Sequence, residues 1–355
     1  MSRSTAPSPH PIIEIGVAFW QSKALLSAVE LGVFAALADG PVPAGQLSRQ
    51  LGLRSRGARD FFDILVASGL LDRDEAGYRL TPPAAEYLDP GRPATDISGY
   101  LSFLNAGFSW WSRLTEGLRS GDRLDFSEAL AAEGSRAPGG RGTLVPPDPG
   151  ADTFGEAFAE SDQVRGFLRA MTGYSMGANR ALVHAFDWAS VRTVVDVGCA
   201  EGSLLGHLAA AWPHLDCVGF DLPQVKTGFE EHLEDTAGVS FRPGDFFSDP
   251  LPEADVIVFG HVLHDWPVET RKMLLRKAHE ALAPGGTVLV YESLIDDDRR
   301  SGLIGLMISL NVSLVSNGGS GYTAAECREW LREAGFSEIG VSHLDGPEHL
   351  VVGTR

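Results

Sequence analysis

Short apolar runs alternate with longer amphipathic segments through the second half of the chain. The runs are rich in β-branched residues and bounded by turn formers, so they predict five strands, at residues 192–197, 215–220, 238–242, 254–260 and 286–292. Helical spacing between them is typical of a parallel sheet covered on both faces. Two further runs, 338–343 and 348–353, flank Asp345-Gly346, which is a strong hairpin signal. The pattern predicts an α/β fold whose parallel sheet ends in an antiparallel hairpin.

The N-terminal part of the chain has helical spacing. Residues 12–38 are apolar on nearly every helical face, and a helix of this kind must be buried. Because a segment at the N-terminus has little of its own chain to pack against, we expect it to pack against a second copy of the protein. Predicted helices at 44–53 and 56–71 and a predicted hairpin at 72–80 follow, which is the order of a winged helix-turn-helix.

Two more helical segments lie between this region and the sheet. Residues 97–118 carry an aromatic-rich surface, and residues 154–186 place several large apolar side chains on one face. Such side chains either line an apolar pocket or pack in the core. The candidate pocket residues on the two helices are Trp111, Phe167, Met171 and Tyr174. Residues 134–152 are dense in Gly and Pro and are expected to form a surface loop or a disordered insertion.

The composition disfavours several classes of protein. A formal net charge of −18 at pH 7 repels phosphate backbones and anionic lipid heads, so neither nucleic acid nor a membrane is expected as a partner. A DNA-binding winged-helix regulator would need a basic face, whereas residues 1–100 hold more acidic than basic residues. Three widely spaced cysteines without a C-x-x-C pair indicate neither a disulfide framework nor a zinc site. The first residues lack the pattern of a secretory signal, so we expect a cytoplasmic protein.

The loop after the first predicted strand has the residues of a nucleotide-binding turn. It reads DVGCAEG over residues 196–202, and glycines in such a turn let backbone N–H groups approach a ligand at a helix N-terminus. Asp221, at the end of the second strand, can accept hydrogen bonds from ribose hydroxyls. A dinucleotide fingerprint would need glycine in place of Ala200 and Ser203, which disfavours NAD. The loop instead resembles the D-x-G-x-G-x-G loop of methyltransferases that use S-adenosylmethionine (SAM), although an ordinary strand-to-helix turn can have the same glycines.

Further motifs follow the other predicted strands, at the sheet edge where ligands bind in open α/β folds. GFDLP stands at 219–223, GDFF at 244–247 and HVLHDW at 261–266, and PGGTVLVYE at 284–292 contains the fifth strand. In this order the motifs resemble those of the small-molecule O-methyltransferase family, which includes plant caffeate-type and bacterial polyketide-tailoring enzymes. The resemblance extends from about Ile12 to the end of the chain.

This resemblance implies a fold, a cofactor and an activity. The fold is a Rossmann-like class I methyltransferase sheet with an antiparallel C-terminal hairpin, preceded by a helical winged-helix dimerisation domain. The activity is SAM-dependent methyl transfer by a homodimer to a hydroxyl of a small aromatic natural product. The implied regions are a winged-helix-like dimerisation domain at 1–100, a helical connector lining the substrate pocket at 101–190, and the SAM-binding domain at 191–355. The residues assigned to the cofactor are Asp196, Gly198, Gly202, Asp221, Leu222, Asp245 and Phe246.

The resemblance also implies that His264 is the general base and that Glu292 lies beside it. A phenol has a pKa of about 10 and an unperturbed histidine one of about 6.5, so the proton should leave as the new bond to carbon forms. A carboxylate on the far imidazole nitrogen would fix the tautomer and stabilise the imidazolium, as in a hydrolase triad. Methyl transfer is an in-line displacement, so the other task of the protein is to hold the reactants in attack geometry.

Residues around His264 have structural interpretations. Asp265 precedes Trp266-Pro267 and is placed as the N-cap of the next helix, and Trp266 is expected to pack in the core. His261 and His264 could suggest a metal pair, but no further cysteine or histidine ligand stands at 301–322, so no metal is expected.

Two positions depart from the family pattern. Gly321 stands where many plant relatives have a second glutamate beside the base, and Gly260 stands where the family often has a basic residue. These departures keep three alternatives open: methylation at carbon, methylation at nitrogen, and SAM binding without methyl transfer. A ligand-sensing regulator is a further alternative. The predicted substrate contacts are Trp111, Phe167, Met171, Tyr174 and Asn311.

Overall fold

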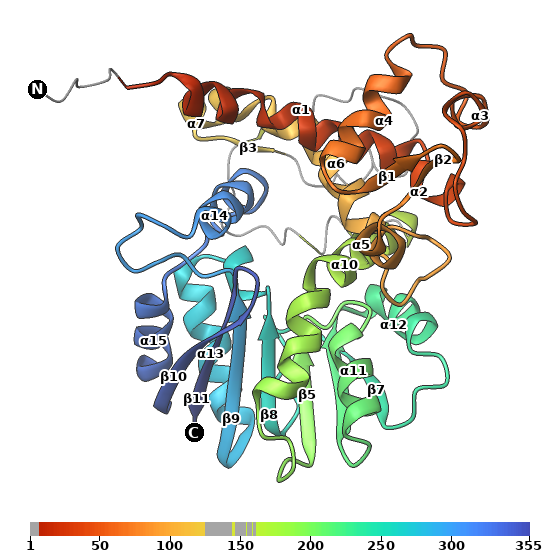
Figure 1. The fold of residues 1–355 in the computed structure, drawn as a ribbon. Coiled ribbons are helices and arrows are strands. Elements are labelled where there is room, and N and C mark those ends of the chain that lie inside the picture. The colour runs from red at the N-terminus through yellow and green to blue at the C-terminus, as the bar shows by residue number, and fades with distance from the viewer. Residues whose placement is uncertain (1–6, 125–143, 146–153, 155–157, 159–160) are drawn as a thin grey trace, which may run out of the picture. The chain divides into compact units, whose positions relative to one another are not determined.

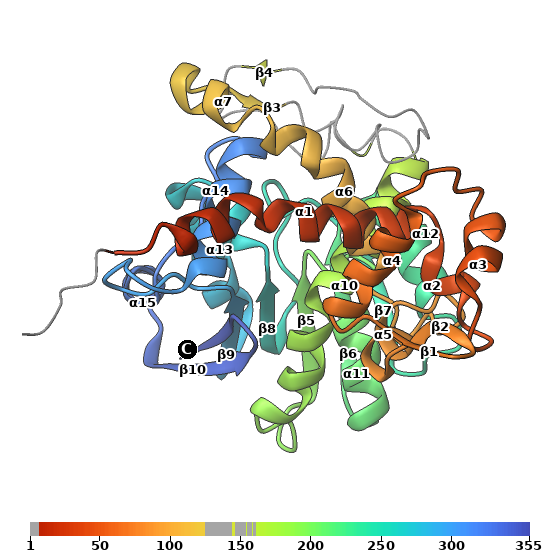
Figure 2. The same ribbon diagram turned by 45° about the horizontal axis from the view of Figure 1, so that its top comes forward.

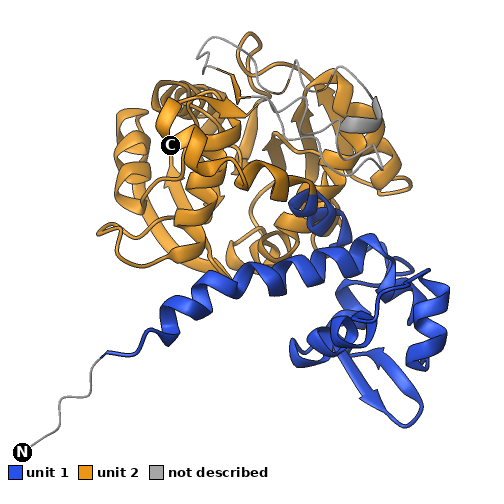
Figure 3. Cartoon of the chain, turned by 90° about the horizontal axis from the view of Figure 1, so that it is seen from above, with its two compact units in different colours: residues 1–105 blue, residues 106–355 orange. Residues whose placement is uncertain are grey.

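The computed structural model describes residues 7–124, 144–145, 154, 158 and 161–355. The chain divides into two compact units, Met1–Asn105 and Ala106–Arg355, which are coloured separately in Figure 3. Helix α6 (Ser98–Trp111) crosses the boundary between them. The division into three regions at residues 100 and 190 stays a prediction. The expected loop at 134–152 lies outside the described residues except for Leu144–Val145, which form the short strand β4.

The first unit has the predicted order of two helices followed by a hairpin. Its core is formed by side chains from every one of these elements, including Leu26, Phe34, Leu47, Phe62 and Tyr78. The strands of the hairpin pair antiparallel in register from Leu71 with Leu80 to Asp74 with Gly77. The elements of this unit before α6 are α1 (His10–Glu30), α2 (Val33–Ala36), α3 (Ala44–Gln50), α4 (Ala58–Ala67), β1 (Leu71–Asp74), β2 (Gly77–Leu80) and α5 (Pro82–Tyr87).

The N-terminal helix differs from the expected single helix at 12–38. It ends before Gly32, whose backbone has φ +72° in the left-handed region, and the chain restarts there as the short helix α2. Only Leu26 and Ala28 of α1 are buried, whereas Ile12 and Ile15 are 76% and 78% exposed. By length and composition alone α1 could also span a membrane. Within one chain, the apolar surface of α1 is therefore largely uncovered.

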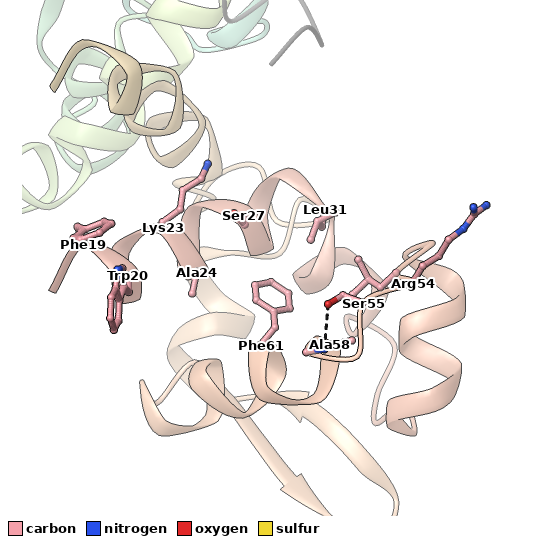
Figure 4. Close-up of a pocket in the computed structure, with 12 residues that line it drawn as sticks. Phe19, Trp20, Lys23, Ala24, Ser27, Leu31, Arg54, Ser55, Ala58 and Phe61 are labelled. Carbon is pink, nitrogen blue, oxygen red and sulfur yellow. Dashed lines mark hydrogen bonds between the residues drawn. The ribbon is translucent and has the colours of Figure 1, made fainter. Parts of the chain in front are cut away.

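A groove in the first unit lies beside this uncovered helix (Figure 4). Its volume is about 440 Å³, and α1 contributes Phe19, Trp20 and Lys23 to its lining, while α4 contributes Phe61. Trp20 is 62% exposed and Phe19 51%. The groove therefore continues the exposed apolar surface of the first turns of α1.

The second unit contains a seven-stranded sheet in the order β10-β11-β9-β8-β5-β6-β7. The strands from β5 to β9 pair parallel, and β10 and β11 pair antiparallel with each other and with β9. This confirms the predicted parallel sheet with an antiparallel C-terminal hairpin. The strands are β5 (Thr193–Val197), β6 (Asp216–Asp221), β7 (Val239–Pro243), β8 (Ala254–Gly260), β9 (Leu282–Glu292), β10 (Ser337–Asp345) and β11 (Glu348–Thr354).

Helices cover both faces of this sheet (Figure 1). Neighbouring residues of a strand point to opposite faces, and both are apolar here, so each face needs a covering layer. Val194 packs with α10 and α11 in one core, and Val195 packs with α13 and α15 in the other. The helical elements are α7 (Leu114–Ser120), α10 (Ser161–Ala185), α11 (Ser203–Ala211), α12 (Lys226–His232), α13 (Val268–Ala281), α14 (Leu303–Val315), α15 (Ala324–Glu333) and the 3₁₀ turns η1 (Pro223–Val225) and η2 (Leu263–Asp265). A small strand β3 (Arg123–Leu124) pairs with β4.

Strand order reverses between β5 and β8, which lie side by side in the middle of the sheet (Figure 2). From β5 the chain adds β6 and then β7 on one side of β5. It then crosses back and adds β8 on the opposite side of β5. In open α/β sheets such a switch point leaves a crevice at the carboxyl ends of the strands, where ligands bind. The candidate site is therefore expected beyond Val197 and Gly260.

Candidate functional site

The loop between β5 and α11 forms a tight backbone cradle. Gly198 and Gly202 have φ values of +73° and +74°, and Ala200 between them has +49°. A Cβ atom on Gly198 would lie 2.7 Å from Val262, and one on Gly202 would lie 2.4 Å from Phe229. A side chain at either position would therefore collide with the packed interior, so the turn requires glycine at both.

Two carboxylates flank the cradle, the buried Asp196 and the half-buried Asp221. Asp221 accepts hydrogen bonds from the backbone N–H of Ala200 at 2.9 Å and from that of Leu222 at 2.7 Å. Burial raises the pKa of Asp196 to about 7, with a further contribution from the charge of Asp221. Burial also raises the pKa of Asp221 to about 6, although its two backbone donors oppose this. A ligand that brings hydroxyl or ammonium donors would relieve the cost of these charges, so the cradle fits an aminoacyl nucleoside such as SAM.

The predicted aromatic residue after β7 packs in a cluster of rings. Phe246 lies 5.6 Å from Trp266 between ring centroids, and Phe154 lies 5.7 Å from Trp266 and 5.8 Å from Phe167. The predicted packing role of Trp266 is confirmed, because only 5% of the residue is exposed. The structure thus joins the cofactor candidate Phe246 to the substrate candidate Phe167 through two intervening rings.

The backbone of the same segment is fixed from α13. Lys277 donates from Nζ to the carbonyl oxygens of Phe246 at 2.5 Å and Asp249 at 2.8 Å. Asp245 accepts a hydrogen bond from the N–H of Phe247 at 2.8 Å. The half-buried Asp245 carboxylate is therefore held at the carboxyl end of β7, as the sequence predicted.

His264 and Glu292 form a buried pair at the carboxyl ends of β8 and β9. Nδ1 of His264 lies 2.7 Å from Oε2 of Glu292, and the backbone N–H of His264 donates to Oε1 at 3.3 Å. Burial opposes the imidazolium, but the charges of Glu292 and Asp265 outweigh it and raise the pKa of His264 to about 9. Burial likewise opposes the carboxylate of Glu292, yet His264 holds its pKa below the usual range. Glu292 does not contact the other ring nitrogen, Nε2.

Asp265 has a different role from the predicted N-cap. The N-cap of α13 is Pro267, and no side chain caps that helix. Instead, Oδ1 of Asp265 lies 3.4 Å from Nε2 of His264, and burial raises the pKa of Asp265 to about 6. The prediction was wrong because the chain turns through η2 before the helix, which directs the carboxylate toward the histidine ring.

A buried arginine that sequence reasoning missed holds this turn in place. Arg271 is 1% exposed and donates from Nε to the carbonyl oxygen of Trp266 at 2.7 Å and from Nη2 to that of Ser320 at 2.7 Å. The N–H of Ser320 in turn donates to the carbonyl oxygen of His264 at 2.8 Å. In the sequence, Arg271 has only the pattern of a polar helix position, so no signal marked it.

The structure explains both departures from the family pattern. A Cβ atom on Gly260 would lie 2.1 Å from the hydroxyl of Tyr291, which donates to Asn179 at 2.7 Å. A Cβ atom on Gly321 would lie 2.7 Å from Cβ of Ser309. Neither place has room for a side chain, so residues from neighbouring elements occupy the space that a basic residue and a second glutamate would need.

The predicted substrate residues fall into separate contacts. Trp111 donates from Nε1 to Oδ1 of Asn311 at 2.9 Å, which joins α6 to α14. Tyr174 on α10 lies beside His261, 4.3 Å between ring centroids, and its hydroxyl is 3.3 Å from Oγ of Ser293. Met171 lies half-buried one helical turn before Tyr174. Among the described residues, no group of three or more His, Cys, Asp or Glu side chains is arranged to hold a metal ion.

A glycine cradle next to a buried His–Glu pair, both at the switch point of a doubly wound sheet, indicates a group-transfer enzyme of the methyltransferase class. Comparison with known families identifies it further. Residues 13–90 match the model of the O-methyltransferase dimerisation domain, and residues 147–337 match that of the O-methyltransferase domain. The chain belongs to this O-methyltransferase family.

Individual relatives cover nearly the whole chain. The tetracenomycin polyketide synthesis 8-O-methyl transferase TcmO of Streptomyces glaucescens is 42% identical over 98% of this chain and 97% of its own length. The N,N-dimethyltransferase OxyT of Streptomyces rimosus is 33% identical over 94% and 92%. The crystal structure of human N-acetylserotonin methyltransferase in complex with SAM has a TM-score of 0.85 at 26% identity, covering 100% of this chain and 99% of the human one. The protein is a SAM-dependent methyltransferase with a class I fold.

Proposed function

We propose that the protein transfers a methyl group from SAM to a phenolic hydroxyl of a small polycyclic natural product, with His264 as the general base. One observation carries the proposal. A histidine with one ring nitrogen held by a buried glutamate at 2.7 Å stands at the carboxyl end of β8, directly beside the strand that leads into the cradle. This arrangement supplies a proton acceptor of fixed orientation next to the place where the cofactor binds.

The cradle residues are proposed to hold the cofactor. When bound, SAM supplies an electrophilic methyl group on a sulfonium centre. Asp221 would accept from ribose hydroxyls, and Asp196 with the backbone of Gly198 and Gly202 would bind the amino acid end. Asp245 and Phe246 would contact the adenine, and Leu222 would cover it. Their shared support is that they stand at one sheet edge, and that burial raises the pKa of both Asp196 and Asp221, a cost that donors on a ligand would relieve.

His264 is proposed to remove the hydroxyl proton as methyl transfer proceeds. Its pKa of about 9 is close to the value of about 10 for a phenol, so a proton can pass between the two groups with little change in free energy. Glu292 balances the charge of the resulting imidazolium. Asp265, near Nε2, adds to that stabilisation and shares the side of the ring that faces the acceptor.

The proposed acceptor class follows from side-chain chemistry and from relatives. Phe167, Met171, Tyr174 and Trp111 are proposed to line the acceptor pocket, and their apolar, largely aromatic side chains would suit flat ring systems. TcmO acts on an oxygen in tetracenomycin polyketide synthesis, and a Streptomyces sahachiroi relative, 32% identical, is a 3-hydroxy-5-methyl-1-naphthoate 3-O-methyltransferase. Both names specify methylation of oxygen, and the second names a naphthoate, which is a fused aromatic ring system.

Methylation of nitrogen is a second candidate, because OxyT is an N,N-dimethyltransferase. A neutral amine attacks the methyl group with its lone pair and releases a proton only after the C–N bond has formed, so it needs no base at the moment of transfer. The present chain nevertheless has a buried His–Glu pair whose pKa matches a phenol, which favours oxygen.

We further propose that the protein works as a homodimer in the cytoplasm. The matched dimerisation domain includes α1, whose apolar surface is uncovered in one chain. Ile12, Ile15, Phe19 and Trp20 would be covered by a second copy. Three buried cysteines without disulfides are compatible with a reducing compartment.

The test is methyl transfer to a panel of hydroxynaphthoates and hydroxyanthraquinones, followed by mass spectrometry and NMR of the products. We expect a gain of one CH₂ and the shift of an aryl methyl ether. The variant His264→Ala should lose a factor of about 10² to 10⁴ in turnover, with S-adenosylhomocysteine (SAH) affinity unchanged. The exposed His184→Ala on α10 is the matched control and should behave as the wild type. A methylamine or C-methyl product, or an unaltered rate in His264→Ala, would overturn the proposal.

A further inference from the structure

We propose that His261 and Glu348 form a second buried histidine–carboxylate pair, which positions Tyr174 against the methyl acceptor and so determines acceptor affinity. This inference rests on the proposed function, because it concerns the acceptor side of the same site. His261 stands three residues before the proposed base, and Glu348 is the first residue of β11. Nothing in the motif around His264 marks Glu348, which lies far away in the sequence.

The hydrogen bonds of His261 show that its role is positioning and not proton transfer. Nε2 of His261 lies 3.0 Å from Oε2 of Glu348, and Nδ1 lies 2.9 Å from Oγ of Ser175. The side chains of His261 and Glu348 are only 5% and 8% exposed. Because both ring nitrogens already have protein partners, His261 has no free position for an acceptor proton. Its influence must pass through the residues that it contacts.

Tyr174 is the residue on which these contacts converge. Its ring lies 4.3 Å from that of His261 between centroids, tilted by 41°. Its hydroxyl is 3.3 Å from Oγ of Ser293, and Ser293 donates to the second oxygen of Glu348. The pair therefore holds Tyr174 twice, by ring packing through His261 and by hydrogen bonding through Ser293. This circuit of contacts, from Tyr174 through His261, Glu348 and Ser293 back to Tyr174, joins α10 to the ends of β8, β9 and β11.

The backbone of His261 is a second, independent observation. Its φ is +55°, in the left-handed region that non-glycine residues seldom adopt. The neighbouring Gly260 is not the residue that takes this conformation. Strain of this kind persists where the surrounding structure over-determines the conformation, and it concentrates at functional sites. The strained backbone aims the imidazole at Glu348 and Ser175, which a relaxed conformation would not do.

The circuit lies next to the proposed base. The rings of His261 and His264 are stacked with 6.2 Å between centroids and 29° between planes. Tyr174 and His264 thus both lie near the His261 ring, with centroids 4.3 Å and 6.2 Å from it. An acceptor whose hydroxyl reaches His264 would extend its rings or a second oxygen to Tyr174. We infer that the pair selects polycyclic phenols with a second oxygen remote from the methylated one.

The test measures kinetics of His261→Asn, Glu348→Gln and Tyr174→Phe with the polyphenol that the wild type methylates best. Asparagine tolerates the left-handed backbone, so His261→Asn keeps the fold and removes the ring. We expect the acceptor KM to rise at least about tenfold in His261→Asn, with kcat and SAH affinity within about threefold of the wild type. Glu348→Gln, which can still hydrogen-bond, should retain part of the affinity that Glu348→Ala loses.

A double-mutant cycle decides whether the pair acts through Tyr174. His261→Asn combined with Tyr174→Phe should raise KM little more than the larger single effect, because both remove one interaction. His214→Asn, which removes a hydrogen bond to Trp188 at the opposite end of the sheet, is the matched control. Additive effects, an unchanged KM, or a parallel loss of SAH binding and thermal stability would overturn the inference. Failure of the proposed function would be a different result. It would appear as a methyl group on nitrogen or carbon of the product, or as an unaltered rate in His264→Ala.

Discussion

The carboxylate of Asp265 lies 3.4 Å from Nε2 of His264, the ring nitrogen that Glu292 does not contact. The histidine therefore has an acid at each ring nitrogen, the buried Glu292 and the half-buried Asp265. Two carboxylates favour the imidazolium over the neutral ring. The free enzyme consequently holds its proposed base in the protonated form near neutral pH and must release that proton before it can accept another.

The first prediction is that kcat/KM rises with pH and levels off at about pH 9. The pKa of His264 is raised to about 9, so the neutral base becomes tenfold scarcer for each pH unit below that value. Glu292→Gln should move the inflection at least about one unit lower and reduce the plateau, because the imidazolium formed in the reaction loses its partner. Initial rates at saturating SAM from pH 6 to 10 measure both.

Asp265→Asn is the companion variant for this profile. It removes the second charge but keeps a polar side chain near Nε2, so its inflection should also move to lower pH. A phenolic acceptor titrates in the same range, but its own pKa is identical in every variant. An inflection that stays at one pH in the wild type and in both variants would assign the titration to the acceptor and not to His264.

The second prediction concerns the two carboxylates at the cradle. The folded-state pKa of Asp196 is raised to about 7, so the stability that its bound proton gives the unliganded protein is complete below the unfolded pKa of about 4 and is lost as the pH rises through 7. Asp196→Asn should therefore raise the melting temperature of the unliganded protein by at least about 2 °C at pH 8, with a gain that is clearly smaller at pH 5 and vanishes near pH 4. Thermal unfolding without ligand measures this.

SAH binding should change in the opposite direction in the same variant. We expect Asp196→Asn to weaken SAH at least about tenfold, and wild-type affinity to fall as the pH is lowered from 8 to 5.5, since protonated carboxylates no longer accept from the ligand. Asp187→Asn, an exposed residue before β5, is the control. If stability and SAH affinity changed together, Asp196 would be a structural residue only.

The fold could be predicted from the sequence because its strands are continuous apolar runs. Every predicted strand of the large sheet exists, and the boundary displaced furthest is the start of β9, which begins at Leu282. That strand starts in a stretch containing Pro284 and two glycines, which read as a turn. The break of the N-terminal helix at Gly32 was missed for a related reason, since one glycine inside an apolar pattern does not reveal its φ angle.

The site could be predicted only where its residues lie in the motifs at neighbouring strand ends. His264 and Glu292 end neighbouring strands, so the rule that ligands bind at strand ends brings them together. His261, Glu348, Ser293 and Ser175 form an equally close network, but they come from three strand ends and a helix. No local pattern predicts that β11 places Glu348 beside β8. For Asp265 the local pattern gave a wrong prediction. Capping rules predicted a helix N-cap, whereas the side chain contacts His264, a tertiary contact that the sequence does not reveal.

The third prediction is that a second glutamate cannot be restored at residue 321. The site for a Cβ atom on Gly321 lies 2.7 Å from Ser309 and 3.1 Å from Ile295, within a loop whose N–H donates to Ser309. Gly321→Glu should therefore lower thermal stability by about 1 to 3 kcal/mol without increasing turnover. Combining it with Ser309→Gly should recover part of the stability, because the Cβ contact is relieved. A faster Gly321→Glu enzyme would show that the pocket has room for the missing carboxylate.

The fourth prediction concerns the uncovered surface of α1. Ile12 and Ile15 are more than three-quarters exposed in one chain, so replacing them with aspartate should not disturb the folded monomer. In a symmetric dimer each substitution occurs twice and removes about 2 kcal/mol of apolar burial per site, so Ile12→Asp with Ile15→Asp should weaken association at least about 1000-fold. Light scattering coupled to size exclusion should give the mass of two chains for the wild type and of one for the double variant at micromolar concentration. The matched control is Val268→Asp at the start of α13, an exposed apolar residue of the second unit, which should retain the wild-type mass. A double variant that kept the mass of two chains would place the dimer interface elsewhere on the molecule, and α1 would then need another explanation for its exposed isoleucines.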